Sequence, residues 1–149
     1  MNRLFGTDGV RGIANTELTC ELCMQIGRAT AYILSENLNG KKLRVLVGKD
    51  TRLSSDMLEN AVSSGLCSVG ADVLQLGFLP TPAVAHLVRE YGCDAGIMIS
   101  ASHNPCEYNG IKIFRSNGYK LPDELEEKIE AIILDNAMEI PTPIEFPIP

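Results

Sequence analysis

The chain has 149 residues, of which 45% are hydrophobic and 21% are charged, and its formal net charge is −6. This composition predicts one soluble globular domain with a packed core, and the acidic balance argues against a nucleic-acid partner. No apolar run approaches the roughly 20 residues of a membrane span, and no secretory signal opens the chain, so we expect a cytoplasmic protein with no membrane partner.

The five cysteines are odd in number, and their spacing indicates no disulfide framework. Cys20 and Cys23 form a Cys-x-x-Cys pair, a spacing found in redox and zinc sites. No second pair completes a metal set, and the surrounding residues favour a helix. We therefore expect both thiols to be small buried side chains.

Helices are predicted from apolar side chains at helical spacing, and strands from short apolar, β-branched runs. Thr19 is a suitable N-cap for the first helix, and Ser54 or Ser55 for the second. In chain order we expect a helix at 18–37, a strand at 43–48, a helix at about 55–69, a strand at 72–77, a helix at 80–92, strands at 95–100 and 111–115, and a helix at 123–134.

Long helical crossovers imply parallel pairing of the first three strands. The third is apolar throughout, so it should be central and covered on both faces. The loop at 101–110 is too short for a crossover, so the fourth strand should be antiparallel. The sequence thus predicts a three-layer α/β/α fold, with a mixed, mainly parallel four-stranded sheet and helices on both faces.

The last nine residues contain four of the eight prolines. This composition is typical of an extended linker rather than of a domain end. We expect residues 1–138 to form the domain and residues 139–149 to be a proline-rich linker toward a second domain that this sequence does not contain.

Polar and basic residues follow the first and third predicted strands. Lys49 and Arg52 come directly after the first strand, and the polar run at 100–105 follows the third. Because the carboxyl ends of parallel strands meet at one edge of a sheet, we expect these residues to lie on the same edge.

Two further cations are expected there. Lys112 starts the fourth strand, and Arg11 belongs to the glycine-rich segment at 6–12. The four basic residues could gather around Ser102, and such local positive charge in an acidic protein suggests a phosphate-bearing partner. Each feature also has a plainer interpretation, since the glycine-rich segment can be a turn, the charged residues a solvated turn, and His103 a hydrogen-bonded loop residue.

Two chemistries compete for Ser102. Acyl transfer by a Ser-His-acid triad is disfavoured, because the Ala-Ser-His-Asn sequence at 101–104 is not a Gly-x-Ser-x-Gly elbow. Phosphoryl transfer through a phosphoserine needs cations, a proton acceptor and usually a divalent metal. The cations are present, but no carboxylate set for a metal is obvious near the serine.

Four motifs occur in an order that resembles the first domain of the α-D-phosphohexomutase family. The resemblance covers nearly the whole chain, and the serine and lysine motifs together are highly specific. The opening motif favours the phosphoglucosamine branch of the family. The motifs are Gly-Thr-Asp-Gly-Val-Arg-Gly at 6–12, Gly-Lys-Asp-Thr-Arg-Leu-Ser at 48–54, Ser-His-Asn-Pro at 102–105 and Asn-Gly-Ile-Lys at 109–112.

The resemblance implies an enzyme that interconverts hexose 6-phosphates and 1-phosphates, here of glucosamine, through a bisphosphorylated sugar. Ser102 would carry the phosphoryl group, with Arg11 and Lys112 beside it and Lys112 a candidate for proton transfer. His103 would position the transferred group or a sugar hydroxyl. The residues expected to bind substrate or phosphate are Thr7, Ser100, Asn104, Lys49 and Arg52.

The family also binds Mg²⁺, through an oxygen of the serine phosphate, here on Ser102, and three aspartates of an Asp-x-Asp-x-Asp motif in its second domain. No such triplet occurs in this sequence. The resemblance implies as partners a phosphosugar substrate, the remaining domains of the enzyme and, because members of this branch are often dimers, a second copy in a homodimer. Without the metal and the substrate clamp, we expect this chain alone to be inactive.

Two alternatives stay open. Phosphomannomutases and phosphoglucomutases share the same first domain, and this segment discriminates weakly among sugars. As an isolated chain, it could instead be a non-catalytic module that binds phosphate or associates with itself.

Overall fold

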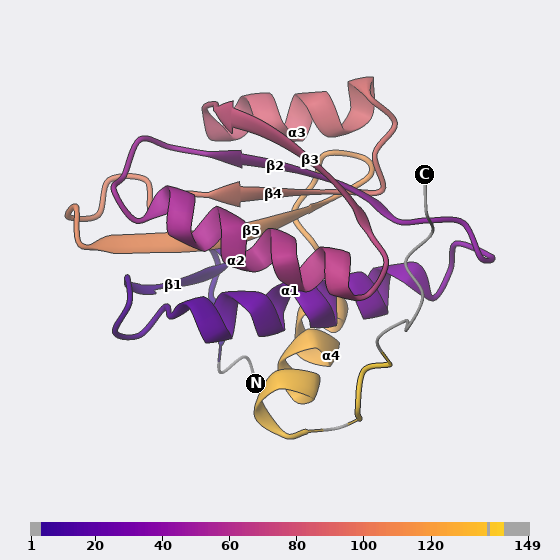
Figure 1. Ribbon diagram of the computed structural model, residues 1–149. Helices are drawn as coiled ribbons and strands as arrows, with labels where there is room; N and C mark the ends of the chain where they lie inside the picture. Colours follow the sequence, from indigo (N-terminus) through magenta and orange to yellow (C-terminus); the bar gives the residue numbers. More distant parts are fainter. Residues whose placement is uncertain (1–3, 137, 142–149) are drawn as a thin grey trace.

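The computed structural model describes residues 4–136 and 138–141 (Figure 1). Within them, helices and strands follow the predicted order, with one additional strand near the N-terminus. The elements are β1 (Val10–Ile13), α1 (Cys20–Ser35), β2 (Arg44–Lys49), α2 (Ser55–Ser68), β3 (Asp72–Phe78), α3 (Thr81–Glu90), β4 (Ala95–Ile99), β5 (Tyr108–Arg115) and α4 (Asp123–Leu134).

The sheet has five strands in the order β1-β5-β4-β2-β3. The pairs of β2 with β3 and β4 are parallel, while β5 is antiparallel to both β4 and β1. The predicted antiparallel last strand and central third strand are confirmed, but the strand count of four is wrong. The additional strand is β1, which overlaps the glycine-rich segment that the sequence predicts as a loop, because two glycines flank Val10 and Arg11.

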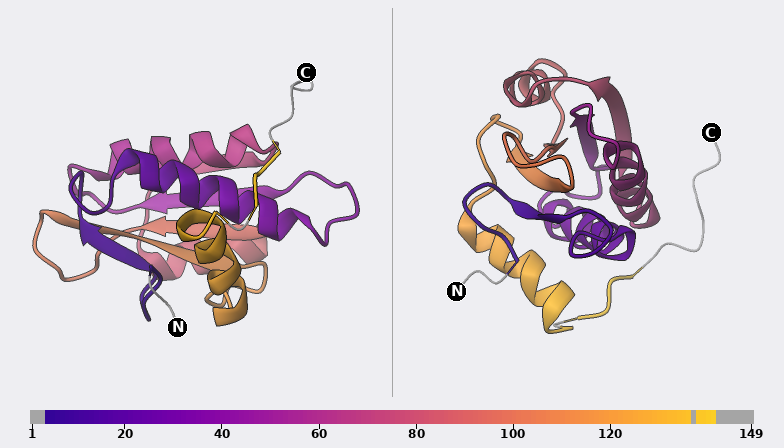
Figure 2. Two further views of the ribbon diagram at one scale, coloured as in Figure 1. Left: turned by 90° about the horizontal axis from the view of Figure 1, so that it is seen from below. Right: turned by 90° about the vertical axis from the view of Figure 1, so that its left-hand side faces the viewer.

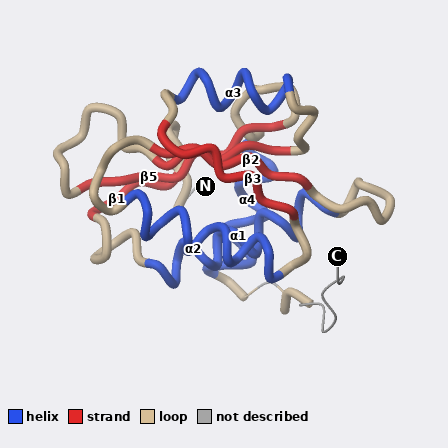
Figure 3. The backbone as a smooth tube through the Cα atoms, turned by 45° about the horizontal axis from the view of Figure 1, so that its top comes forward, coloured by secondary structure: helices blue, strands red, loops and turns tan. Residues whose placement is uncertain are grey.

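Helices cover both faces of the sheet, as predicted (Figures 1 and 3). α3 lies alone on one face, where Val84 and Val88 pack with Leu46, Met98 and Phe114 of the strands. α1, α2 and α4 lie on the other face over the larger core, which the second view in Figure 2 shows along the strands. Successive side chains of a strand point to opposite faces of the sheet, so only every second residue of a strand can reach a pocket on the α3 side.

Local signals explain the helix ends. The Thr19 hydroxyl accepts a hydrogen bond from Leu22 N at 3.1 Å, which confirms the predicted N-cap of α1. α1 and α2 pack closely at Gly27 and Gly65, where an added Cβ would lie 2.4 Å from Val62 O and 2.2 Å from Met24 O respectively.

The Cys-x-x-Cys pair lies at the start of α1. Cys23 is buried, and burial, with a smaller contribution from Cys20, raises the pKa of its thiol to about 12. The thiol is therefore protonated at neutral pH. Among the described residues, no helix is both long enough and apolar enough to cross a lipid bilayer. Most of the predicted linker, residues 142–149, lies outside the described residues.

Candidate functional site

Three neighbouring strands bring Ser102, Arg11 and Lys112 to one small pocket. Ser102 follows β4, Lys112 lies in β5 opposite Met98, and Arg11 lies in β1 opposite Gly110. The pocket has a volume of about 150 Å³ and is lined by Asp8, Arg11, Thr81, Met98, Ser100, Ser102 and Lys112. The sequence prediction that these three residues share one edge of the sheet is thus met in space.

Gly110 makes the close approach of β1 and β5 possible. A Cβ at this position would lie 2.7 Å from Ser100 O and 2.9 Å from Arg11 Cγ. Any larger residue would therefore displace the stem of Arg11 or the strand end that precedes Ser102.

Ser102 has a left-handed backbone, with φ of 57°. It is the second residue of a tight turn in which Asn104 N donates to Ala101 O at 3.0 Å. This conformation costs a non-glycine residue roughly 1–2 kcal/mol, so surrounding contacts must hold it. Ser102 is exposed and lines the 150 Å³ pocket and also a second, more open one, so it lies where the two pockets adjoin.

The two cations of the pocket have few internal partners. Arg11 Nη1 lies 3.8 Å from an Asp8 carboxylate oxygen, a long and solvent-exposed ion pair. Lys112 Nζ lies 5.6 Å from the centroid of the Phe114 ring, and within the described residues no carboxylate pairs with it. Exposed pairs of this kind contribute little to stability, so both cations remain available to an anion in the pocket.

Lys49 lies elsewhere. Its ammonium donates to Asp56 at 2.5 Å and to Glu59 at 3.0 Å, and it stands 5.1 Å from the centroid of the Phe78 ring. The hydrogen bonds from Lys49 to Asp56 and Glu59 raise the pKa of the ammonium. The sequence predicts Lys49 among the cations around Ser102, but neither pocket that Ser102 lines includes it.

Arg52 contacts the serine loop, defined here as residues 101–108, through the backbone carbonyls of the loop. Its guanidinium donates to four backbone carbonyls of that loop and to the Asp50 carboxylate. Burial by itself would raise the pKa of Asp50. Hydrogen bonds from Ser100, the Arg52 backbone and side chain, and Ser55 outweigh that effect and lower it. Asp50 is therefore ionised at neutral pH and forms the anionic anchor of this segment.

The remaining predicted residues lie in different places. Ser100 lines the 150 Å³ pocket, and its Oγ accepts from Ser102 N at 3.0 Å. Asn104 lines the second pocket, of about 440 Å³, with Arg52. Thr7 lines a neighbouring hollow with Arg11. His103 is exposed and lines neither pocket that contains Ser102, so its predicted role stays a prediction.

Sequence reasoning missed three residues that line the 150 Å³ pocket, Asp8, Thr81 and Met98. Thr81 is the first residue of α3, whose N-terminal end carries a partial positive charge suited to an anion. Its signal was present in the sequence, since Pro80 and Pro82 frame a helix start directly after a strand. Asp8 lies in the glycine-rich segment that contributes Arg11.

The described residues bring together no group of three or more His, Cys, Asp or Glu side chains that could hold a metal ion. Asp8 is the one carboxylate among the residues that line the 150 Å³ pocket. A divalent cation prefers several oxygen ligands, so the described residues do not by themselves fit a resident Mg²⁺.

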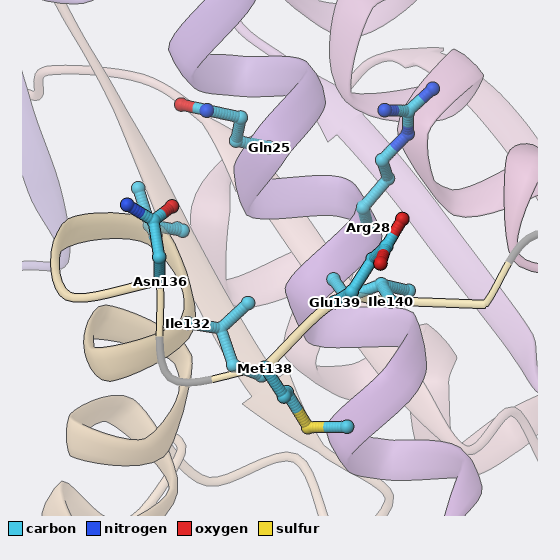
Figure 4. A pocket seen from close by; sticks show the side chains of 8 residues that line it. Gln25, Arg28, Ile132, Asn136, Met138, Glu139 and Ile140 are labelled. Carbon is cyan, nitrogen blue, oxygen red and sulfur yellow. The ribbon is translucent and has the colours of Figure 1, made fainter.

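A different hollow, of about 440 Å³, lies between α1, α4 and residues 138–140 (Figure 4). Figure 4 shows Gln25 and Arg28 of α1 on one side and Ile132 and Asn136 on the other. Arg28 Nε already donates to Ser68 Oγ at 3.0 Å. The hollow gathers no set of cations or nucleophiles, and we assign it no chemistry.

Comparison with known proteins yields one domain family and many relatives. The model of the family "Phosphoglucomutase/phosphomannomutase, alpha/beta/alpha domain I" matches residues 2–139. A phosphoglucosamine mutase of Ruminiclostridium cellulolyticum is 60% identical, over 97% of this chain and 32% of its own length. One of Caldicellulosiruptor saccharolyticus is 64% identical, over 91% of this chain and 30% of its own length.

Solved structures agree with the fold. A putative phosphomannomutase of Thermus thermophilus has a TM-score of 0.78 and 34% identity, over 87% of this chain and 29% of its own. A phosphoglucomutase/phosphomannomutase family protein of Burkholderia thailandensis has a TM-score of 0.74 and 28% identity, over 93% and 31% respectively. The chain spans about a third of the length of the curated relatives it matches.

Proposed function

The chain belongs to the phosphoglucomutase/phosphomannomutase family as its α/β/α domain I, and we propose that it is the serine-bearing domain of a phosphoglucosamine mutase. The observation that carries the proposal is the 150 Å³ pocket in which an exposed serine, Ser102, lies with Arg11 and Lys112. A hydroxyl beside two cations can carry a phosphoryl group and have its charge neutralised there.

The proposed reaction is a phosphoryl exchange between Ser102 and the sugar. The phosphoryl group passes from the Oγ of Ser102 to a free hydroxyl of glucosamine 6-phosphate or glucosamine 1-phosphate. The P–Oγ bond breaks as a P–O bond to the sugar forms, and the proton of the sugar hydroxyl leaves through a base as Oγ regains one. The bisphosphorylated sugar then returns its other phosphoryl group to Ser102 by the reverse step.

In this proposal Arg11 and Lys112 stabilise the charge that spreads over the transferred oxygens, and Lys112 exchanges the proton. The N-terminal end of α3, at Thr81 in the lining of the same pocket, adds positive potential. His103, Thr7, Ser100 and Asn104 remain proposed contacts of the transferred group or of the sugar.

The choice of amino sugar is supported by the relatives. Those at about 60% identity are named phosphoglucosamine mutases, whereas the solved putative phosphomannomutase is 34% identical. A phosphomannomutase or phosphoglucomutase is the second candidate, because solved relatives of both descriptions share this fold.

We further propose that the substrate clamp and most ligands of a divalent cation, Mg²⁺, belong to the rest of the enzyme, so that this chain alone is inactive. The proposal is supported by the described residues, which gather no metal-binding cluster, and by the two-thirds of each relative that extends beyond the match. A homodimer stays a prediction. We also propose a cytoplasmic protein, because free cysteines suit a reducing compartment.

The decisive experiment replaces Ser102 with alanine in the complete mutase. Ser102→Ala should abolish turnover of glucosamine 6-phosphate and remove the added mass of one phosphate from the intact protein. Ser116→Ala, in the exposed turn after β5, is the matched control and should behave as the wild type. Near-normal turnover in Ser102→Ala would show that the phosphoserine assignment is wrong.

A further inference from the structure

We propose that Arg52 is a positioning residue that fixes Ser102 for phosphoryl transfer, rather than a phosphate ligand. This inference rests on the proposed function of Ser102. It assigns to the Asp50–Arg52 segment the task of holding the serine loop in a conformation that the loop does not favour by itself.

Every donor of the Arg52 guanidinium is engaged within the protein. An arginine side chain has five N–H groups, one on Nε and two on each Nη. Nε donates to Asp50 Oδ2 at 3.2 Å. Nη1 donates to Pro105 O at 2.7 Å and Tyr108 O at 3.0 Å. Nη2 donates to Ser102 O at 3.0 Å and Asn104 O at 2.8 Å.

These bonds leave Arg52 no N–H for a ligand. Its side chain is also only 12% exposed, whereas that of Arg11 is 30% exposed and, among the described residues, forms no ion pair besides the long contact with Asp8. A phosphate could bind Arg52 only by displacing carbonyls of the serine loop. The two arginines therefore have different tasks, although both lie near Ser102.

The backbone of Ser102 is held on both sides. Its carbonyl accepts from Arg52, and its N–H donates to the Ser100 hydroxyl oxygen at 3.0 Å. The first bond fixes the peptide plane after Ser102 and the second fixes the plane before it. Together they restrain φ and ψ of a residue whose φ of 57° costs roughly 1–2 kcal/mol.

Asp50 anchors both restraints. Its carboxylate accepts from the Arg52 side chain and from the hydroxyl of Ser100, the residue that binds Ser102 N. Ser55 Oγ donates to Asp50 at 3.0 Å, and Asn109 Nδ2 in turn donates to Ser55 Oγ at 3.1 Å. The serine loop is thus tied to the start of α2 and of β5, two rigid elements.

The kinetic test uses Arg52→Lys and Arg52→Gln in the complete mutase, with Arg115→Lys at the exposed end of β5 as the control. Lysine keeps the charge but has three donors on one atom, so it cannot bind four carbonyls and a carboxylate. A positioning role predicts that both Arg52 variants lose about 10²-fold in kcat with KM nearly unchanged, because a misplacement of about 1 Å costs that much.

A phosphate-binding role predicts the opposite pattern. Arg52→Lys would then retain much more activity than Arg52→Gln, and the loss would appear mainly in KM. That result, or wild-type kcat in Arg52→Lys, overturns the proposal.

A second measurement does not depend on mutase activity. In this 149-residue chain, amide hydrogen exchange at Ser102 and Asn104 should be faster in Arg52→Lys than in the wild type and in Arg115→Lys, while Ile97 in the core of β4 stays protected. Unchanged exchange at Ser102 overturns the positioning role even if Ser102→Ala is inactive. Faster exchange with an active Ser102→Ala variant overturns the proposed function and leaves the loop restraint established.

Discussion

Two pairs of basic residues lie near the same edge of the sheet, and they differ in what the fold does with their charge. Lys49 and Arg52 are engaged with carboxylates and carbonyls of the protein. Arg11 and Lys112 line the pocket of Ser102, and within the part of the chain that the structure describes their charged groups make only a long ion pair and a ring contact. A basic residue can bind a ligand only if the fold leaves its donors unused, and this difference cannot be read from the residue type.

The largest expected effect concerns Arg11 and Lys112, the pair that lines the pocket of Ser102. Replacing Lys112 with alanine in the complete mutase should lower kcat by roughly 10²–10³-fold, the range observed when one stabilising group of a transition state is removed. Thermal unfolding should hardly change, because Lys112 has no carboxylate partner among the described residues. Lys128→Ala, on the exposed face of α4, is the control of equal charge. Equal activity in both variants would break the comparison.

The second prediction concerns Lys49, which belongs with Arg52 to the pair that binds carboxylates of the protein, and its measure is the free energy of unfolding. Lys49→Met keeps the length of the side chain but leaves Glu59, a 4% exposed carboxylate whose Oε2 has no hydrogen-bond partner among the described residues, without its cation. The pair is only part-buried, because the Lys49 side chain is 12% exposed, and removing the cation costs about 1–3 kcal/mol. Urea denaturation of this chain should show that loss in the free energy of unfolding. Lys41→Met, at an exposed position, should be neutral, and an equally neutral Lys49→Met would contradict the assignment.

The smallest expected effect is the pH dependence of stability that comes from Asp50, the carboxylate partner of Arg52. The folded-state pKa of Asp50 lies below its ordinary value of 3.8, so its contribution is fully present above that value and is lost as the pH falls through the lowered pKa. Asp50→Asn should therefore unfold more easily than the wild type at pH 6, by about 1 kcal/mol, and the difference should shrink as the pH falls below 3.8. A difference that stays unchanged as the pH falls below 3.8 would show that the charge of Asp50 is not responsible.

Glu126 changes the free energy of unfolding with pH in the opposite direction to Asp50, and the same pH series measures it. Burial raises the pKa of this carboxyl above its ordinary value of 4.5, despite its hydrogen bond with Lys120. The folded state therefore binds this proton more readily than the unfolded state, and falling pH favours folding through this group. Glu126→Gln should remove that gain, whereas Asp50→Asn should leave it in place.

The sequence predicted the parts of the fold that local patterns determine. α4 was predicted with the bounds Asp123–Leu134 that the structure has, and Thr19 caps α1 as expected. β1 was missed because its stability comes from pairing with β5 at the other end of the chain, not from its own composition. The partners of Arg52 and Lys49 could not be predicted from the sequence for a related reason. The carbonyl partners of Arg52 lie fifty or more residues further along the chain, and the carboxylates that engage Lys49 come from the next helix.

The pairing of β1 with β5 also has a consequence for biosynthesis. Arg11 is made among the first residues, but its partner strand and Lys112 are made near the end of the domain, and Glu130 of α4 then accepts from Leu4 N and Phe5 N. During synthesis from the N-terminus, the ribosome therefore releases β2, α2, β3, α3 and β4 before the pocket can close. A nascent chain that stops before β5 has its parallel strands but no assembled pocket, so Ser102, Arg11 and Lys112 come together only in the last stage of folding.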